Sequence, residues 1–326
     1  MTSPAIASNK TGSEIILRNK QFCNLTEVVV RPEDTMESLL AKVNVATFLG
    51  TLQSTLVNFR YLRKKWRDNT EEERLLGVSL TGIMDHPLLS NQQAYIHNNN
   101  GTRYTLEEVL DELKNQAVDY NDELAEMMGI NPSTSITCVK PSGTVSQLVD
   151  SASGIHPRFS KYYIRTVRAD VKDPLAQFMI DKGFYYEEDM MNPHNYVFYF
   201  PMKAPDESVV VSEVGAMDQL KVWSKYQDFW CEHKPSMTCY YTDDEFLQIG
   251  QWIWDNLDKI SGISFLPYDD HVYPQAPYQP CTEEEYNEWL AKMPTDIDWT
   301  ELEAYEATDN TTASQELACK GGSCEI

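Results

Sequence analysis

The sequence predicts an α/β fold with a largely parallel sheet, and three observations support this. Short runs rich in β-branched and aromatic residues alternate with longer stretches whose apolar residues recur at helical spacing. Two Thr-x-x-Glu capping boxes, at Thr105 and Thr242, mark helix beginnings between these runs. The 326 residues are 42% apolar, which is enough for a substantial core. Alternation on this scale is typical of strand–helix–strand units.

The expected helices follow in chain order. Residues 36–66 carry apolar side chains at helical spacing and lead into Arg63-Lys-Lys-Trp-Arg67, so one long helix is expected there. A second helix begins at the Thr105 box and ends at Gly129. Three more are expected over residues 174–182, 215–231 and 242–260.

The expected strands lie between these helices. They cover residues 78–84, 136–139, 162–167, 196–200, 237–241 and 263–266. Residues 95–104, with Asn98-Asn-Asn-Gly101 at their centre, predict an inserted hairpin.

The segment Lys140-Pro-Ser-Gly-Thr-Val145 directly follows an expected strand and precedes an apolar run that could start a helix. Ser142 and Thr144 offer hydroxyl groups, and Gly143 offers an amide without a side chain. A helix N-terminus built from small residues can bind phosphate. The alternative is an ordinary strand-to-helix turn that Ser or Thr caps.

Cysteines lie near both ends of the chain. Cys23 is close to the N-terminus, and Cys319 and Cys324 flank a short Gly-Gly spacer at the other end. Residues 303–315 before this pair are polar and are expected to be mobile. A dithiol on a mobile arm predicts a shuttle that reduces a buried disulfide through a mixed disulfide. The alternatives are half of a metal site, for which no second Cys/His pair lies nearby, and two inert thiols. The remaining cysteines are expected to be small buried hydrophobes: Cys138, Cys231, Cys239 and Cys281.

Charge and composition narrow the function classes. A net charge of −23 disfavours binding to a nucleic-acid backbone, although one local phosphate site would still allow a nucleotide. The sequence has no N-terminal apolar segment of signal or membrane-spanning length, so no membrane partner is expected. Seven scattered cysteines, an odd number, favour a reducing cytoplasm.

Taken together, four motifs resemble the C-terminal half of adenosylcobalamin-dependent, class II ribonucleotide reductases. They are Phe22-Cys-Asn-Leu25, Lys140-Pro-Ser-Gly-Thr-Val-Ser-Gln147, Ser153-Gly-Ile-His-Pro-Arg-Phe159 and the Cys319/Cys324 pair. The resemblance spans residues 14–326. It implies the C-terminal half of a ten-stranded α/β barrel, built from two five-stranded halves around a finger loop. Residues 1–12 would be an atypical leader, residues 13–300 the catalytic barrel half with an insertion near 90–104, and residues 301–326 a flexible tail with the redox cysteine pair.

The resemblance also implies the activity, which is reduction of ribonucleotides to 2′-deoxyribonucleotides by radical chemistry. Glu14 matches the base at the ribose 3′ hydroxyl, and Cys23 matches a thiol that reduces the departing 2′ hydroxyl. Cys319 and Cys324 match the external reductant of the active-site disulfide. The implied cofactor is adenosylcobalamin, whose cobalt is held by the corrin, so no protein metal ligands are expected.

The binding residues implied by the resemblance form two groups. The substrate group is Pro141, Ser142, Gly143, Thr144 and Val145, and the cofactor group is Gly154, Ile155, His156 and Pro157. For His156 a purely structural role is an equal alternative. The implied partners are a ribonucleotide, the N-terminal half of the reductase and a thioredoxin-type reductant.

One position departs from the family pattern. Gly12 stands where the radical cysteine belongs, and Lys10-Thr11 replace Asn-Pro. Without that thiol, hydrogen-atom abstraction cannot start. A split gene or protein splicing, with Ser13 as the splicing nucleophile, would explain the change, and so would a truncated or engineered chain. The alternative functions are a catalytically inactive fragment, a nucleotide-binding or subunit-binding remnant, and a fragment of a class I reductase. The class I alternative rests on Tyr240-Tyr241, which could be a radical-relay pair or two strand aromatics.

Overall fold

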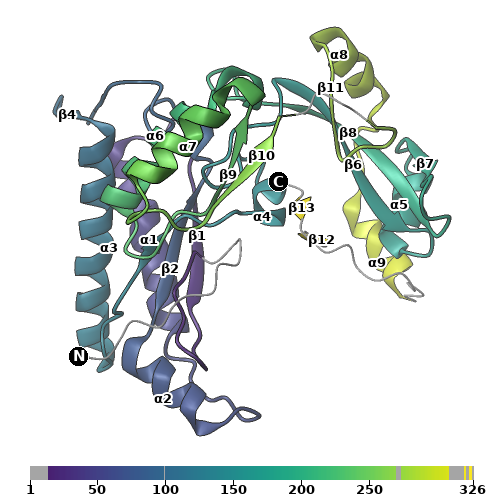
Figure 1. Ribbon diagram of the computed structural model, residues 1–326. Helices are drawn as coiled ribbons and strands as arrows, with labels where there is room; N and C mark the ends of the chain where they lie inside the picture. The colour runs from purple at the N-terminus through teal and green to yellow at the C-terminus, as the bar shows by residue number, and fades with distance from the viewer. Residues whose placement is uncertain (1–13, 99, 269–272, 308–318, 321–322, 325–326) are drawn as a thin grey trace. The chain divides into compact units, whose positions relative to one another are not determined.

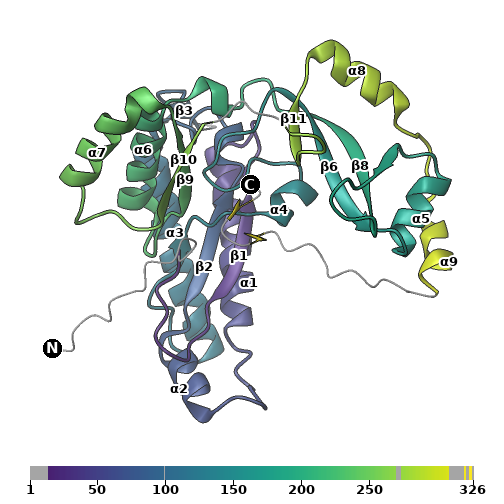
Figure 2. The same cartoon turned by 45° about the vertical axis from the view of Figure 1, so that its right-hand side comes forward.

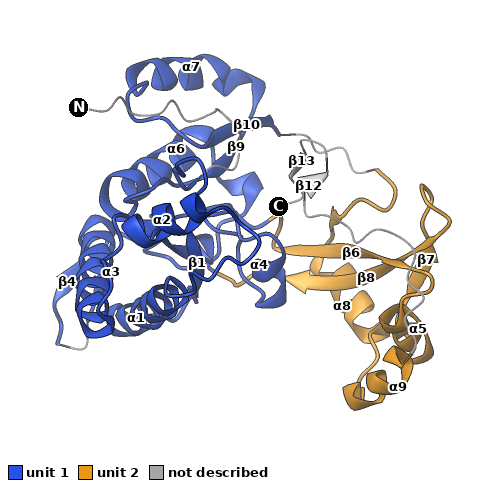
Figure 3. Cartoon of the chain, turned by 90° about the horizontal axis from the view of Figure 1, so that it is seen from below, with its two compact units in different colours: residues 1–158, 207–268, 326 blue, residues 159–206, 269–325 orange. Residues whose placement is uncertain are grey.

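The computed structural model describes residues 14–98, 100–268, 273–307, 319–320 and 323–324 (Figure 1). The chain divides into two compact units (Figure 3). The first contains residues 14–158 and 207–268, and the second is built from residues 159–206 and 273–307. The range 13–300, treated above as one barrel half, therefore holds two units.

The first unit contains parallel strands. They are β1 (Asn24–Val29), β2 (Leu76–Thr81), β5 (Thr137–Cys138), β9 (Met237–Tyr241) and β10 (Ile263–Pro267). Strands β1, β2 and β5 form one sheet in that order, and β9 pairs with β10. A parallel bridge between Val139 and Pro235 joins the two sheets, so the spatial order is β1-β2-β5-β9-β10. The predicted α/β class is confirmed, but these small sheets do not close into a barrel.

Helices accompany these strands. They are α1 (Met36–Gln53), α2 (Lys64–Glu73), α3 (Leu106–Met128), α4 (Thr144–Leu148), α6 (Ala216–Lys225) and α7 (Phe246–Asp255), with a π-helical turn at Tyr226–Trp230. Both predicted capping boxes form, at Thr105 and Thr242, and Gly129 ends α3 with φ 65°. The predicted hairpin is β3 (Ile96–His97) with β4 (Arg103–Tyr104). Among the described residues, no helix combines the length and the apolar character that a membrane crossing requires.

The long helix predicted over residues 36–66 is wrong as a single element. Helix α1 ends at Gln53, and α2 begins only at Lys64. Arg74, which follows α2, donates from Nη1 to the Ser54 carbonyl at 2.7 Å. If α1 continued past Gln53, the Ser54 carbonyl would accept a backbone amide of the following turn. Arg74 takes that place, so a residue distant in sequence stabilises the end of α1.

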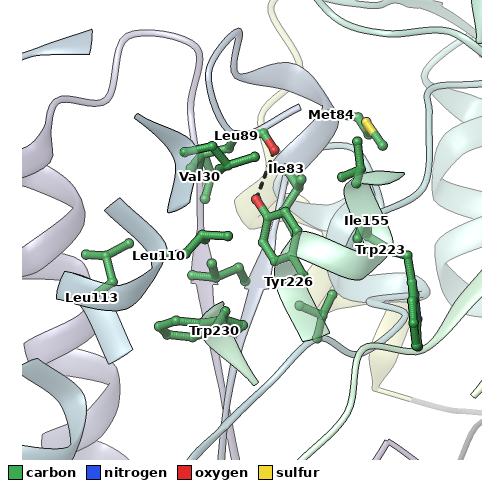
Figure 4. Close-up of a cluster of buried hydrophobic side chains, with 14 of the residues drawn as sticks. Val30, Ile83, Met84, Leu89, Leu110, Leu113, Ile155, Trp223, Tyr226 and Trp230 are labelled. Atoms are coloured by element: carbon green, nitrogen blue, oxygen red, sulfur yellow. Dashed lines mark hydrogen bonds between the residues drawn. The ribbon is translucent and has the colours of Figure 1, made fainter. Parts of the chain in front are cut away.

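The core of the first unit combines helix and strand side chains (Figure 4). Its three largest members, Trp223, Tyr226 and Trp230, are fully buried. Each donates to a backbone carbonyl: Trp223 Nε1 to Pro235 at 2.9 Å, the Tyr226 hydroxyl to Leu89 at 3.0 Å, and Trp230 Nε1 to Cys138 at 2.7 Å. The aromatic groups therefore bury their rings without leaving a polar atom unpaired, and Trp230 ties its π-helical turn to β5.

The second unit is an antiparallel sheet in the order β11-β6-β8-β7. Its elements are β6 (Tyr162–Asp170), α5 (Pro174–Asp181), β7 (Tyr186–Glu188), β8 (Asn195–Lys203), β11 (Tyr278–Pro280), α8 (Glu283–Lys292) and α9 (Leu302–Glu306). The strands predicted at 162–167 and 196–200 exist, but they pair antiparallel. The predicted largely parallel sheet is thus a property of the first unit alone.

The chain leaves the first unit twice, after residue 158 and after residue 268, and after the first departure it returns close to where it left. Arg158 and Val210 form a parallel bridge, and the Arg158 amide donates to the Val209 carbonyl at 2.9 Å. The segment 159–206 of the second unit is inserted between these adjoining backbone positions.

In the predicted tail, residues 301–326, the structure describes helix α9 and one short hairpin, β12 (Cys319–Lys320) with β13 (Ser323–Cys324). The expected mobile segment therefore begins with a helix, in which Tyr305 packs against Phe178 and donates from its hydroxyl to Asp181 at 2.8 Å. The backbone register places Cys319 opposite Cys324. The predicted leader, including Gly12, lies outside the described residues.

Candidate functional site

One face of the parallel strands in the first unit is polar. Glu27 on β1, Ser79 on β2 and Cys138 on β5 stand side by side in register. Because strand residues alternate between faces, Cys23 and Lys140 share this face with them. The opposite face carries apolar residues such as Val28, Val78, Leu80, Met237 and Cys239, which belong to the helix-covered core. We call Cys23, Glu27, Ser79, Cys138 and Lys140 the polar face.

Glu14 lies against this face. Its side chain is 10% exposed, and its Oε1 atom is 3.9 Å from Lys140 Nζ. Burial raises the pKa of Glu14, while the Lys140 and Lys234 ammonium groups oppose that rise. A carboxyl group with a raised pKa holds a proton more readily than an ordinary glutamate, which suits it to accept and return a proton.

Cys23 is held next to Glu14. Burial, together with the Glu14 charge, raises the pKa of the Cys23 thiol to about 12. Space for the sulfur depends on Gly77 of β2, because a Cβ atom at that position would lie 3.2 Å from Cys23 Sγ and 2.4 Å from Leu25 Cδ2. The sequence-predicted Glu14 and Cys23 are therefore brought together, with the thiol in its protonated form at neutral pH.

Cys23 is expected to resist alkylation in the folded chain. With a pKa of about 12, roughly one thiol in ten thousand is ionised at pH 8, against roughly one in ten for an ordinary cysteine. Iodoacetamide labelling at pH 8, mapped by mass spectrometry, should be on the order of 1,000-fold slower at Cys23 than in urea-unfolded chain. Equal rates in the two states would contradict this placement of the thiol.

Cys138 is buried, as predicted for a small hydrophobe. However, ionisable and polar side chains lie near its thiol as well as apolar ones. Burial raises the pKa of its thiol, and the Cys23 and Glu14 charges add to the rise, while a hydrogen bond with Ser79 lowers it. Cys239 is also buried, whereas Cys231 and Cys281 are half-buried. Cys138 is thus a second thiol on the polar face, which the sequence interpretation missed.

The predicted phosphate turn is already hydrogen-bonded within the protein. The Ser142 hydroxyl donates to Glu27 Oε1 at 2.7 Å. The amides of Ser142 and Gly143 donate to Ser153 Oγ at 3.1 and 3.3 Å. Gly143 caps α4 without a side chain, so the alternative of a Ser or Thr cap does not apply. One hydroxyl oxygen thus occupies the position at which two amides could hold an anion oxygen.

The predicted cofactor residues do not fit direct contact with a corrin in this chain. Residues 154–157 are all buried. Gly154 has φ 55°, and a Cβ atom there would lie 2.6 Å from the Lys140 carbonyl oxygen. His156 Nδ1 donates to the Ser153 carbonyl at 2.8 Å, and its Nε2 accepts the Thr238 amide at 2.9 Å. Burial lowers the pKa of His156, so its ring is neutral. The ring connects the backbone at Ser153 to the backbone of β9 at Thr238.

A buried ion pair holds the loop that carries Ser153. Arg158 Nε and Nη2 each donate to an Asp85 carboxylate oxygen at 2.9 Å, and Arg158 Nη1 donates to Asp150 at 2.8 Å. Asp85 also accepts the Ala152 amide at 2.8 Å. These bonds fix the two ends of the loop and with them the position of Ser153.

The remaining predicted residues are placed as follows. Pro141 and the exposed Thr144 and Val145 lie on the same turn as Ser142 and Gly143. Tyr240 and Tyr241 are consecutive on β9 and therefore point to opposite faces, so they do not form a stacked radical-relay pair. For Cys319 and Cys324 only the backbone hairpin is described. Among the described residues, no group of three or more side chains is arranged to hold a metal ion.

Sequence reasoning gave no individual role to several residues of the site, although two of them, Lys140 and Ser153, open quoted motifs: Glu27, Ser79, Lys140, Ser153 and Lys234. A signal for the strand members exists, because Cys23, Leu25 and Glu27 alternate with β-branched or polar neighbours, and Cys138 alternates with Lys140. Ser153 has no such signal, since its role depends on a contact between two loops.

The fold and site together define an α/β protein that presents a carboxylate and thiols on the polar face of a parallel sheet. No family model matches the chain. The chain is similar to the adenosylcobalamin-dependent ribonucleoside-triphosphate reductase of Lactobacillus acidophilus, with 26% identity over 96% of this chain and 44% of that protein. A protein of the same name from Euglena gracilis is 26% identical over 94% of this chain and 40% of its own length. The resemblance inferred from the motifs is therefore confirmed.

A solved structure of a B12-dependent, class II ribonucleotide reductase shares the fold. It superposes with a TM-score of 0.73 at 22% identity, covering 91% of this chain and 43% of that chain. At this identity the match establishes the fold alone. The chain spans less than half the length of these relatives.

Proposed function

We propose that this chain is the C-terminal catalytic portion of a ribonucleotide reductase, which converts ribonucleotides to 2′-deoxyribonucleotides by radical chemistry. The observation that carries the proposal is the meeting of Glu14 and Cys23 beside Lys140 on the polar face. The names of the curated relatives support the same activity.

In this proposal the two side chains have separate proton tasks. Glu14 takes the proton of the ribose 3′ hydroxyl, because its carboxyl group has a raised pKa and lies next to two ammonium groups. Cys23, protonated at neutral pH, gives its proton to the departing 2′ hydroxyl, and the hydrogen of a second thiol replaces that hydroxyl at C2′. The C2′–O bond breaks, water leaves, and two thiols become one disulfide. The second thiol of that pair is expected in the N-terminal half.

Substrate phosphates are proposed to bind at the 142–144 turn. It follows the carboxyl end of β5, where ligands of parallel sheets commonly bind. The Ser142 and Gly143 amides converge on one oxygen, now Ser153 Oγ, and the exposed Thr144 lies beside them. A phosphate oxygen would replace the Ser153 hydroxyl in this position.

The remaining parts of the proposal concern the cofactor, the other half of the barrel and the external reductant. Adenosylcobalamin, when bound, would supply the radical, and the buried residues 154–157 are not proposed to contact it. The five parallel strands are proposed to be one half of a ten-stranded barrel that an N-terminal half completes. A thioredoxin-type protein in the cytoplasm is proposed to recharge the tail cysteines.

The activity is tested by mixing the chain with adenosylcobalamin, a ribonucleotide and a dithiol, with and without an N-terminal half that ends in Asn-Pro-Cys. Deoxyribonucleotide is expected only when that half is present, because Gly12 provides no thiol. No product in either mixture would favour the second candidate, an inactive nucleotide-binding or subunit-binding remnant. Gly12 is the observation that favours that candidate.

Replacing Cys319 and Cys324 together by Ser is expected to block repeated turnover with a thioredoxin-type reductant while sparing a single turnover. The reason is that the first turnover uses the active-site thiols, whereas later ones need a mobile dithiol. Rapid-quench product counting separates the two regimes. Full thioredoxin-supported cycling in the double variant would remove the shuttle role.

A further inference from the structure

The turn before α2 and the beginning of that helix carry a dense group of positive charges. Residues 60–67 hold five of the 27 Lys and Arg residues of the chain and no acidic residue. We call these five cations, all of them exposed, the basic surface: Arg60, Arg63, Lys64, Lys65 and Arg67. In a chain with a net charge of −23, such a group is a local exception.

Ion pairs within the fold do not account for these cations. The acidic residues at the end of α2 all have cation partners. Glu71 pairs with Arg67 at 2.9 Å. Glu72 and Glu73 pair with Arg18 at 3.0 and 2.9 Å. By contrast, within the described part of the chain, the side chains of the other four members of the basic surface form no ion pair or hydrogen bond.

The charges also oppose the dipole of their own helix. Lys64 and Lys65 occupy the first turn of α2, where cations are unfavourable, and the last turn carries acidic residues but no basic one. The N-cap residue, Arg63, provides no side-chain hydrogen bond to the first turn. Residues that break a local rule without a gain to the fold are expected at functional sites.

Aromatic side chains hold the basic surface in place and extend it. The ring of Phe22 contacts those of Phe59 and Trp66, with centroids 4.9 and 4.7 Å away. Tyr61 lies among the cations in the sequence and is 99% exposed, so its ring is accessible to a partner. Tyr, Trp and Arg are the residues that most often contribute binding energy at protein–protein interfaces.

The basic surface is not part of the proposed phosphate site. Helix α2 lies beyond the ends at which β1 and β2 begin (Figure 2). The 142–144 turn follows the carboxyl end of β5, which runs parallel to β2, so it lies toward the opposite end of these strands. The cations are therefore available to a different anionic ligand.

We infer that the basic surface docks a short acidic segment of a partner protein. Carboxylates form charge-assisted hydrogen bonds with Lys and Arg, and apolar side chains of the segment can contact the exposed Tyr61 and Leu62. Nucleic acid and anionic membranes are disfavoured, because they would extend beyond eight residues and meet the remainder of a chain whose net charge is −23. The inference does not depend on the reductase activity.

The test measures binding of fluorescein-labelled decaglutamate to the full chain by fluorescence anisotropy. The triple variant Arg63→Glu, Lys64→Glu, Lys65→Glu is expected to bind at least about 10-fold more weakly than the unchanged chain, because like charges would face the peptide. Replacing the same three residues by Gln should give an intermediate loss. Raising the salt concentration from about 50 to about 300 mM should weaken binding to the unchanged chain.

The matched control is Lys172→Glu, Lys221→Glu, Lys259→Glu, which makes the same change in net charge at exposed positions elsewhere. Its dissociation constant should differ from that of the unchanged chain by less than about threefold, since screening weakens the effect of distant charges. Urea unfolding should show the variant at residues 63–65 at least as stable as the unchanged chain, because acidic residues in the first turn suit the helix dipole. Its loss of binding then cannot be assigned to unfolding.

Equal affinity of the two triple Glu variants, or no measurable binding of decaglutamate by the unchanged chain, overturns the inference. Two further probes represent the competing ligands: an oligothymidylate of about the same charge as decaglutamate, and vesicles of phosphatidylserine. Weaker binding of both supports an acidic protein segment. Tighter binding of either one, lost in the variant at residues 63–65, would assign the basic surface to that ligand instead.

Discussion

Replacing Glu14 by Gln is expected to lower the turnover number of the reconstituted reductase by about 10²- to 10⁴-fold, with little change in ribonucleotide affinity. That loss corresponds to about 3–5 kcal/mol of activation free energy. The amide keeps the size of the side chain and can still accept hydrogen bonds, but it cannot take a proton from the 3′ hydroxyl. Rapid-quench kinetics and nucleotide titration measure the two quantities. Unchanged turnover would remove Glu14 from the mechanism.

The matched comparison for that experiment is Glu27→Gln. Burial also raises the pKa of Glu27, but its carboxylate accepts from the Ser142 hydroxyl at 2.7 Å and so belongs to the phosphate turn. Its substitution should weaken nucleotide affinity more than it lowers turnover. If Glu27→Gln mainly lowers turnover and Glu14→Gln mainly weakens nucleotide affinity, the proposed tasks of the two carboxylates are exchanged.

Stability provides an internal check on the Glu14 variant. The folded state raises the pKa of Glu14, so the folded chain holds its proton more tightly than the unfolded chain. The free energy of unfolding therefore falls as the pH rises from the ordinary glutamate pKa to the raised pKa of Glu14 in the folded chain. The glutamine variant has no such decrease, because its side chain does not ionise. At pH 7 the variant should be at least as stable as the unchanged chain, so a loss of turnover cannot be assigned to unfolding.

Replacing Arg158 by Ala is expected to lower the free energy of unfolding by about 3–5 kcal/mol. Arg158 is 5% exposed and Asp85 is 1% exposed, so the substitution leaves a carboxylate buried without its cation. Urea denaturation of the full chain, followed by tryptophan fluorescence, measures the loss. A loss below about 1 kcal/mol would show that water or another group replaces the guanidinium.

Two controls bracket this result. Lys221→Ala breaks an ion pair with Asp218 whose side chains are 62% and 63% exposed, and it should cost less than about 1 kcal/mol. The double change Asp85→Leu, Arg158→Met removes both buried charges and should cost less than Arg158→Ala alone. If the double variant is less stable than Arg158→Ala, the two side chains stabilise the fold by hydrogen bonds and packing as well as by neutralising each other's charge.

Local signals in the sequence were sufficient for much of the fold. The strand predicted at 237–241 has the observed bounds Met237–Tyr241, and the boxes at Thr105 and Thr242 begin helices as predicted. These features depend on neighbouring residues only. Strand β1 was not predicted, because its six residues include polar Asn24, Thr26 and Glu27.

Features that depend on distant residues could not be predicted in this way. The end of α1 is fixed by Arg74, which lies beyond the next helix. The polar face exists because β1, β2 and β5 are neighbours in register, and no single segment carries that information. Glu14 and Cys23 were found from a family resemblance, whereas the roles of Ser153 and Lys140 require coordinates. Charged or polar residues on strands of a helix-covered sheet were the one signal that could have indicated this face.

The bridge between Arg158 and Val210 has a consequence for how such proteins can change over time. Because the segment 159–206 departs and re-enters at adjoining backbone points, its length can change without altering the spacing of the parallel strands. Insertions or deletions between β6 and β8 are therefore expected to leave the polar face of the parallel strands in place.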